Sequence, residues 1–291
     1  MTRVVDSDLG GRLFIGMQYL LPQHALSRIV GWIAASRVGL VRTALIRAFL
    51  SRYAVDLAEA AQPSADRYES FNDFFTRRLR AGARSFDAEP GAALCPADGI
   101  VSHAGPIAGD TLLQAKGIDY SAAALLGGDA ALAAEFQGGA FATVYLAPHN
   151  YHRVHMPMAG TLRIARFVPG DLFSVNATTA ASVPGLFTRN ERIACVFDTA
   201  SGPLAVVLVG ALFVGSMSLA WAGRVRADGS RKPRDLPCRD PVIALDRGAE
   251  LGWFNMGSTV VVLLPPRGPV LHEGITAGRS VRVGEPIASP R

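Results

Sequence analysis

Residues 260–264 are Val-Val-Val-Leu-Leu, and they follow directly on Gly257, Ser258 and Thr259. A short, continuous run of β-branched and aliphatic residues predicts a strand that is buried on both faces. Such a strand needs a covering layer on each side, so much of the chain must be arranged around it. Because glycine permits an unusual backbone conformation, the simplest interpretation of the preceding residues is a turn that leads into this strand.

The chain has 291 residues, which is enough to bury a large core. Its residues are 49% hydrophobic and only 18% charged, so we expect some apolar surface to contact something other than water. Cys95, Cys195 and Cys238 are far apart and form no Cys-x-x-Cys pair. This spacing suggests neither a disulfide framework nor a thiolate zinc site, and it fits a reducing, cytosol-facing compartment.

No Asp or Glu occurs in residues 9–55, whereas arginines recur through this stretch. Apolar residues at near-helical spacing predict amphipathic helices here, with Trp32 suited to a membrane interface. We expect them to lie on an anionic membrane surface. A helical subdomain covering the core and a basic face for nucleic acid are the alternatives. No window reaches the roughly 18 uninterrupted apolar residues of a spanning helix, and the first residues do not resemble a cleaved signal peptide.

The remainder predicts an α+β fold, in which the amphipathic N-terminal helices precede a β-rich, barrel- or sandwich-like catalytic core. Residues 71–79 predict a short helix and residues 121–136 a second helical stretch. From residue 94 onward, frequent Gly and Pro with short apolar runs are typical of strands and tight turns. Glycine spacing in residues 275–287 resembles the hairpins of lipoyl-type barrels. We therefore expect a helical region at 1–65 and a β-rich catalytic domain at 66–291.

Three histidines, His149, His152 and His155, fall within seven residues. One interpretation is a zinc site built from three imidazoles, as in a zinc hydrolase. Another is acid–base catalysis, in which Asp98 orients an imidazole that deprotonates Ser258. A third interpretation is that the histidines are ordinary hydrogen-bonded residues and that Asp98 is a turn residue before Gly99. The spacing of these residues leaves the three interpretations open. A fourth alternative is that the protein is not an enzyme but a membrane-docked, lipoyl-like binding module.

Several motifs together resemble those of the phosphatidylserine decarboxylases, in the same order along the chain. They are residues 71–79, Pro96-Ala97-Asp98-Gly99, residues 114–117, Tyr151-His152-Arg153-Val154-His155-Met156-Pro157, residues 168–175 and Gly257-Ser258-Thr259. The resemblance covers about residues 19–286 and is to the short form of the family. Two departures are Met256, where the family usually has Leu, and His149-Asn150, which replaces a basic–acidic pair. Met for Leu conserves volume, whereas Asn150 leaves the local orientation of the histidines open.

This resemblance implies a proenzyme that cuts itself between Gly257 and Ser258. Residues 1–257 would become the larger chain and residues 258–291 the smaller, and Ser258 would become a covalent pyruvoyl cofactor. That ketone would act as the electron sink for decarboxylation of phosphatidylserine to phosphatidylethanolamine. We expect His152 to be the base in self-cleavage and later to help protonate the substrate carbon. We expect Asp98 to orient His152, and His155 to contribute secondarily.

The resemblance also carries expectations about partners and location. It implies phosphatidylserine as substrate, no metal and no nucleic acid. It also implies two cleaved chains that stay together, and it leaves room for a homodimer. With the basic N-terminal helices, it places the protein peripherally on the cytoplasmic face of the cell membrane.

Overall fold

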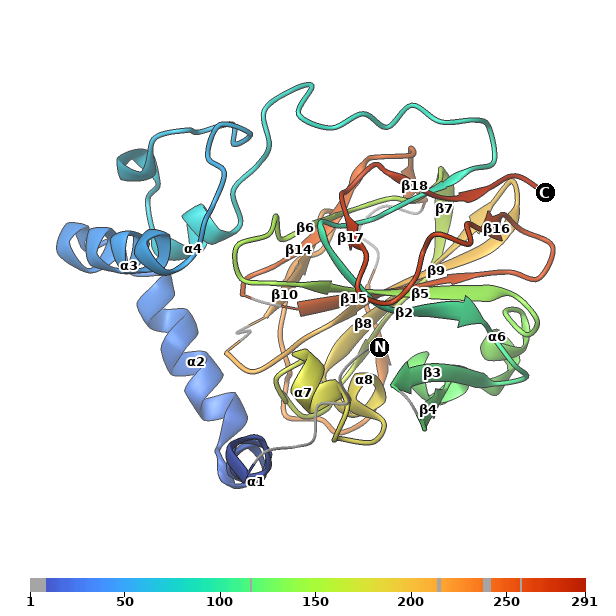
Figure 1. Cartoon of the computed structure of the whole chain (residues 1–291), viewed down its shortest axis with the longest axis horizontal. Helices are drawn as coiled ribbons and strands as arrows, with labels where there is room; N and C mark the ends of the chain where they lie inside the picture. The colour runs from blue at the N-terminus through green and yellow to red at the C-terminus, as the bar shows by residue number, and fades with distance from the viewer. Residues whose placement is uncertain (1–8, 116, 214–215, 238–241, 257) are drawn as a thin grey trace.

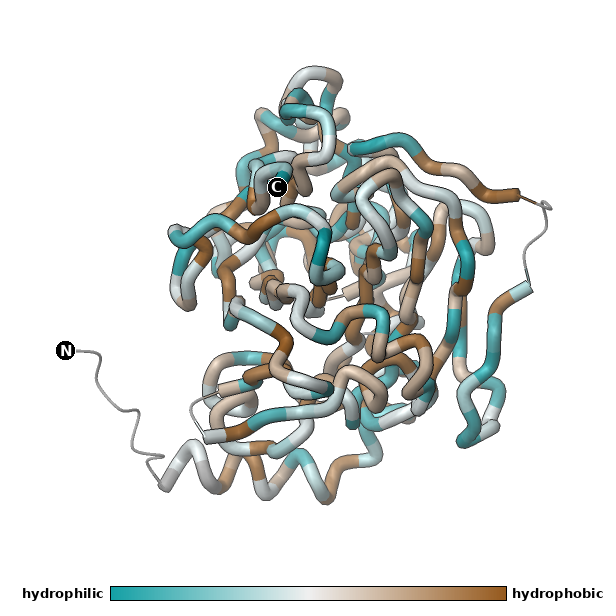
Figure 2. The backbone as a smooth tube through the Cα atoms, turned by 90° about the vertical axis from the view of Figure 1, so that its right-hand side faces the viewer, coloured by the Kyte–Doolittle hydropathy of each residue, from teal (hydrophilic) through white to brown (hydrophobic). Residues whose placement is uncertain are grey.

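The computed structural model describes residues 9–115, 117–213, 216–237, 242–256 and 258–291. Its first part is helical and comprises α1 (Leu9–Leu20), α2 (Gln23–Ala34) and α3 (Gly39–Arg52). These helices lie on one side of a β-rich body (Figure 1). In Figure 2, hydrophobic and hydrophilic segments alternate along the helix that follows the N-terminal trace. The predicted helices are therefore present, but only α1 and α2 are amphipathic, because apolar and polar residues of α3 are not separated to opposite faces.

Two glutamines, the buried Gln18 and the half-buried Gln23, attach the corner between α1 and α2 to the body of the protein. Gln18 Oε1 accepts a hydrogen bond from the Ser174 amide at 2.7 Å, and Gln23 Oε1 accepts one from the Leu172 amide at 2.6 Å. Burial of an amide is tolerated only when its polar atoms find partners. These bonds therefore set where the N-terminal helices meet the core.

The next helix, α4, spans Phe71–Phe75 and follows a 3₁₀ turn at Ala65–Arg67. The Ser70 hydroxyl accepts a hydrogen bond from the Asp73 amide at 3.0 Å and so caps the N-terminus of the helix. The helix ends four residues earlier than the predicted boundary at Leu79. Its aromatic rings pack against Phe49 of α3, so the N-terminal helices and α4 share one apolar cluster.

The body contains a nine-stranded antiparallel sheet and three smaller sheets. In spatial order, the large sheet consists of β12 (Arg234–Asp235), β7 (Gly160–Val168), β8 (Arg192–Thr199), β9 (Gly202–Val209), β15 (Ser258–Leu264), β5 (Ala140–Leu146), β2 (Gly99–Pro106) and β17 (Ser280–Val281), with β13 (Ala244–Leu245) paired to β7. A four-stranded sheet has the order β11 (Gly223–Val225), β10 (Met217–Leu219), β14 (Glu250–Phe254) and β6 (Arg153–His155). The other two sheets join β1 (Ala93–Leu94), β18 (Pro286–Ser289) and β16 (Val270–Leu271), and β3 (Thr111–Ala115) with β4 (Ile118–Ser121).

Strand β15 is the Ser-Thr-Val-Val-Val-Leu-Leu run, and it lies inside the large sheet between β9 and β5. All seven of its residues are buried. The buried strand predicted at 260–264 is confirmed, but Ser258 and Thr259, which were expected in the turn before it, belong to the strand. Val260 and Val262 point into an apolar layer shared with Phe254 of the four-stranded sheet, which we call the inter-sheet layer. Val261 and Leu263 point into the layer on the opposite, helix-covered face. The described strands form a sandwich-like core rather than a closed barrel, so the α+β prediction is confirmed without its barrel alternative.

Two local predictions differ from the structure. The helical stretch expected at 121–136 is divided into α5 (Ala122–Leu125) and α6 (Ala130–Ala134), since Gly127 and Gly128 both adopt positive φ. The predicted C-terminal hairpin is also absent from the described pairings, because β17 pairs with β2 and β18 pairs with β1 and β16. The remaining short helices are α7 (Ala177–Ala180) and α8 (Leu186–Arg189).

Candidate active site

Ser258 is the first residue of β15 and pairs with Leu146, the last residue of β5. Its side chain is buried, with only 1% of the residue exposed. Within the part of the chain that the structure describes, Ser258 Oγ has no hydrogen-bond partner. Gly257, the other half of the predicted cleavage site, lies outside the described residues. A buried hydroxyl without a partner costs free energy, so this position calls for a functional explanation.

The turn before Ser258 is held by Asn255, whose importance the sequence reasoning missed. The Asn255 amide nitrogen Nδ2 donates to the Ser216 carbonyl at 2.9 Å and to Ser218 Oγ at 3.2 Å. Its oxygen Oδ1 accepts from Asn72 of α4 at 3.4 Å. Asn255 therefore ties the residues before β15 to β10 and to the N-terminal helical cluster. An asparagine directly before the Met-Gly-Ser sequence is the signal that could have revealed it.

His152 lies just before β6, where its carbonyl accepts a hydrogen bond from the Phe254 amide at 3.0 Å. The imidazole is completely buried and stacks on Phe75 of α4, with the ring centres 4.1 Å apart. Its Nε2 lies 3.2 Å from the Pro148 carbonyl oxygen. Because a carbonyl can only accept, Nε2 carries the proton and Nδ1 carries the lone pair. Nδ1 has no partner among the described residues, so it is free to accept a proton.

The electrostatic setting keeps His152 neutral. Burial, together with the nearby Arg77 guanidinium, lowers its pKa to about 3. The Arg77 Nη2 atom is fixed by donating to the carbonyls of His149 and Asn150 at 3.0 and 3.2 Å. His152 is therefore deprotonated throughout the physiological pH range and can act as a base without first losing a proton.

His155 lies three residues further on, at the end of β6, and has a different environment. Its Nδ1 is 2.8 Å from the Gly248 carbonyl, so that nitrogen carries the proton, and Nε2 accepts from the Tyr151 hydroxyl at 2.9 Å. Burial lowers the pKa of His155, and the charges of Glu250 and Asp98 oppose this shift. Both ring nitrogens are therefore engaged, unlike those of His152.

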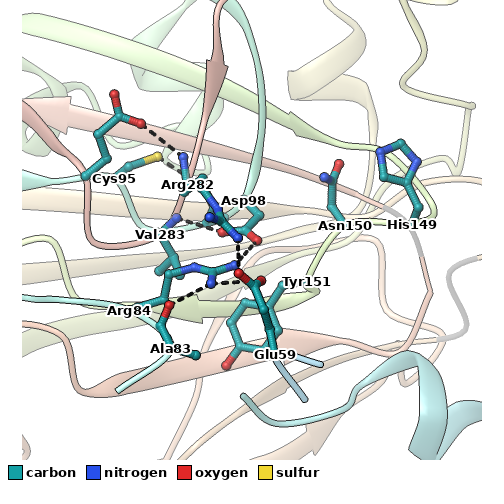
Figure 3. Close-up of polar contacts among 12 residues, drawn as sticks. Glu59, Ala83, Arg84, Cys95, Asp98, His149, Asn150, Tyr151, Arg282 and Val283 are labelled. Atoms are coloured by element: carbon teal, nitrogen blue, oxygen red, sulfur yellow. Dashed lines mark hydrogen bonds and ion pairs between the residues drawn. The ribbon is translucent and has the colours of Figure 1, made fainter. Parts of the chain in front are cut away.

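Asp98 does not make the contact that the sequence reasoning assigned to it. Its Oδ2 accepts from Arg84 Nη2 at 2.7 Å, and its Oδ1 accepts from the Val283 amide at 2.8 Å (Figure 3). Arg84 is also bound by Glu59, so the carboxylate lies in a network of charged groups. Among the described residues no hydrogen bond joins Asp98 to His152, whose orientation is set instead by the Pro148 carbonyl. Among the histidines, the charge of Asp98 acts on His155.

The sheet nevertheless brings Asp98 and Ser258 to the same end of the large sheet. Tyr145 of β5 pairs with Ile100 of β2 on one side and with Thr259 of β15 on the other. Asp98 precedes β2 and Ser258 begins β15, so both lie at the end where β5 runs into the loop that carries the histidines. Residues more than a hundred positions apart in the sequence thus meet around one strand end.

The residues that depart from the family pattern also have defined places. Asn150 Oδ1 accepts from the Ala147 amide at 2.7 Å and so closes the turn after β5. His149 is exposed on this turn. The described residues contain no group of three or more His, Cys, Asp or Glu side chains placed to hold a metal ion. His149, His152 and His155 each face separate surroundings, which does not fit the zinc alternative.

This arrangement defines an α+β enzyme site with a buried serine hydroxyl and a neutral imidazole at one end of a central strand. The comparisons with known proteins agree. The family model described as phosphatidylserine decarboxylase matches residues 71–289, and one described as PSD matches residues 13–54. The chain belongs to the phosphatidylserine decarboxylase family, and it is a decarboxylase.

Three relatives illustrate the similarity, and each is named phosphatidylserine decarboxylase proenzyme. The protein from Pseudomonas aeruginosa strain LESB58 is 54% identical over 283 residues, which cover 96% of this chain and 98% of the relative. The one from Ectopseudomonas mendocina is 54% identical, with 94% and 96% covered. The one from Pseudomonas putida KT2440 is 53% identical, with 96% and 98% covered.

Proposed function

We propose that this enzyme decarboxylates phosphatidylserine to phosphatidylethanolamine with a pyruvoyl group that it makes from Ser258. The names of the relatives indicate the substrate and the proenzyme character. The observation that carries the proposal for this chain is the buried Ser258 hydroxyl without a partner at the start of β15. A buried serine hydroxyl without a partner is explained if self-cleavage uses that hydroxyl as its nucleophile.

Self-cleavage begins when Nδ1 of His152 takes the proton of Ser258 Oγ. The oxygen attacks the Gly257 carbonyl carbon, the peptide C–N bond breaks as the Ser258 nitrogen takes the proton from His152, and an ester replaces the peptide bond. Loss of the Ser258 α-proton then expels the Gly257 carboxylate, which leaves a dehydroalanine at the new chain start. Water replaces its nitrogen, ammonia departs and a pyruvoyl group remains. The Nδ1 atom of His152 has a lone pair and no partner among the described residues, so it is available for the first proton transfer.

The described residues fit a pyruvoyl group at position 258. When formed, it supplies a ketone that condenses with the substrate amine and accepts the electrons released with carbon dioxide. Around it, burial excludes water, the Pro148 carbonyl and the Phe75 ring hold His152, and Asn255 fixes the preceding turn. Asp98 and Arg84 hold the strand end from the other side of β5.

Ser258→Ala and Thr259→Val test the cleavage as a matched pair. Both hydroxyls are buried without a partner among the described residues, but Thr259 lies next along the strand and so points to the opposite face. We expect Ser258→Ala to remain one chain without pyruvoyl. Thr259→Val should be cut like the wild type. A denaturing gel and intact mass measurement check both, and a wild-type chain that stays whole with an ordinary serine would refute the proposal.

The histidine assignment needs its own pair of variants. We expect His152→Gln to stay largely uncut, because glutamine can replace the Nε2 donor but offers no basic Nδ1. His155→Gln should be cut at a reduced rate, since its engaged imidazole supports the surrounding strands. Efficient cleavage of His152→Gln together with an uncut His155→Gln would transfer the base to His155, near Asp98.

We also propose that the N-terminal helices dock on the cytoplasmic surface of an anionic membrane. Leu20, Trp32 and Leu40 are 87%, 79% and 86% exposed, and each lies on α1, α2 or α3. Among the described residues no single helix is long and apolar enough to cross a membrane. Helices α2 and α3 together reach that length and composition, but they bend by 109°. Exposed apolar residues beside arginines favour a position in the lipid interface.

Membrane docking is tested with substitutions of equal chemistry at two places. Trp32→Glu and Leu40→Glu place a charge in the proposed interface and should reduce sedimentation with vesicles that contain phosphatidylglycerol. Val270→Glu is the control, because Val270 is also exposed but lies on β16, far from the helices (Figure 1). Equal binding by all three variants would exclude the N-terminal helices as the docking surface.

A further inference from the structure

A cavity of about 420 Å³ lies at the corner between α1 and α2, and the proposed cleavage chemistry uses none of the residues that line it. Its walls come from three segments: the corner at residues 19–25, the segment that contains Asp171 and Phe173, and Arg189 at the end of α8. In Figure 1, α1 and α8 both lie in the lower part of the molecule. Cavities of this size can hold a small organic group.

Hydrogen bonds join the three segments to one another. The Asp171 amide donates to the Arg189 carbonyl at 2.8 Å, which links the second segment to the third. Gln23 Oε1 accepts from the Leu172 amide at 2.6 Å, which links the corner to the second segment. The shape of the cavity is therefore set by the fold, and a ligand would not have to create it.

Arg189 is held in place by two aromatic rings. Its guanidinium carbon lies 5.5 Å from the ring centre of Tyr19 and 5.3 Å from that of Phe173, and the two rings pack edge to face. Among the described residues the guanidinium donates no hydrogen bond, because Asp171 Oδ2 is 3.7 Å away and forms an ion pair only. The rings thus fix an arginine whose N–H groups remain available for a phosphate.

Asp171 places a negative charge beside this positive one. The two side chains are 42% and 52% exposed, so a ligand can reach both. A phosphate would accept hydrogen bonds from Arg189, and an ammonium group would donate to Asp171. The phosphoethanolamine headgroup carries these two charges and no others. Phosphatidylserine adds a carboxylate, which Asp171 would repel, and phosphatidylglycerol lacks the ammonium group.

The cavity opens beside the proposed membrane-docking surface. Tyr19, which lines the cavity, is 51% exposed, and the neighbouring Leu20 is the most exposed of the large hydrophobic side chains. Apolar side chains of an interfacial helix enter the boundary between headgroups and acyl chains. Leu20 in that position would hold the cavity at the depth of the headgroups, so a membrane lipid could reach it.

We propose that this cavity binds the phosphoethanolamine headgroup of a membrane phospholipid, with the phosphate on Arg189 and the ammonium group on Asp171. The site is separate from the reaction centre, because β8 and β9 lie between Asp171 and Ser258 in the large sheet. The proposal rests on the proposed function and on docking by the N-terminal helices. It adds that the docked enzyme recognises the lipid that its own reaction produces.

Sedimentation of the full-length enzyme with two kinds of vesicle tests the site. Both contain the same fraction of phosphatidylglycerol, and the remainder is phosphatidylethanolamine or phosphatidylcholine, whose methylated ammonium has no N–H to donate. We expect the wild type to bind the phosphatidylethanolamine vesicles on the order of 10-fold more tightly. Arg189→Gln and Asp171→Asn should each lose this preference. Attraction to phosphatidylglycerol alone would weaken in the first variant and strengthen in the second, because the two substitutions change the net charge in opposite directions.

Arg267→Gln is the matched control, because Arg267 is an exposed arginine between β15 and β16, and it should keep the preference. The preference should also survive addition of inorganic phosphate at constant ionic strength, and its loss would show a site for free phosphate instead. An undiminished preference in Arg189→Gln or Asp171→Asn overturns the proposal. A wild type that binds both vesicles equally overturns this proposal alone, whereas one that binds neither overturns the docking proposal as well.

Discussion

The buried, neutral state of His152 makes a quantitative prediction about acid stability. Its pKa is about 3 in the folded protein, against an ordinary value of 6.5. The unfolded chain therefore binds a proton as the pH falls below 6.5, whereas the folded protein does not until the pH approaches 3. The stability that depends on neutral His152 is present above pH 6.5 and is lost as the pH falls. One pH unit is worth about 1.4 kcal/mol, so lowering the pH from 7 to 5 should cost about 2 kcal/mol through this residue.

The measurement compares Ser258→Ala with Ser258→Ala/His152→Gln, so that both proteins stay uncut. Urea unfolding at pH 7 and pH 5 gives the free energy of unfolding for each. The single variant should lose about 2 kcal/mol more than the double variant over this range. Other titrating groups, including His155 and Glu191, are present in both proteins and cancel in the difference. Equal losses would show that His152 is not buried as a neutral imidazole, and the argument for its role as a base would fail.

Three further substitutions probe the surroundings of the site. A Cβ at Gly99 would lie 2.3 Å from the Tyr145 carbonyl oxygen, so Gly99→Ala should lower the unfolding free energy by about 1–3 kcal/mol, measured in urea. Arg84→Met leaves the Asp98 carboxylate without its ion pair and should cost about 3 kcal/mol, whereas Arg84→Lys should cost less. Phe75→Leu removes the ring that stacks on His152 and should slow cleavage on a gel time course more than it lowers the melting temperature. Unchanged cleavage in that variant would show that the stacking does not position the imidazole.

Elements defined by local composition could be predicted from the sequence. The acid-free stretch forms α1, α2 and α3, and Ser70 caps α4 because a cap depends only on residues within one turn. The all-apolar run became a strand buried on both faces. Pairing between distant strands was not predictable, since nothing local specifies that β17 joins β2 rather than β18.

The candidate site shows the same division. Ser258, His152, His155 and Asp98 could be selected from motifs, and the sheet brings their segments to one region. The partners of Asp98 could not be foreseen, because Arg84 precedes it by 14 residues whereas Val283 follows it by 185.

The position of β15 inside the large sheet determines how the protein can refold after it has been cut. Cleavage before Ser258 would free the end of a strand that is hydrogen-bonded on both sides and that continues into β16, β17 and β18, which pair with β1 and β2 among others. The small chain would remain interwoven with the large one, held without a covalent link. Refolding from separated fragments would then require two chains to find each other before the central strand could form. Folding would be a first-order event in the precursor and a second-order event afterwards, so the mature enzyme should persist through slow unfolding rather than through ready refolding.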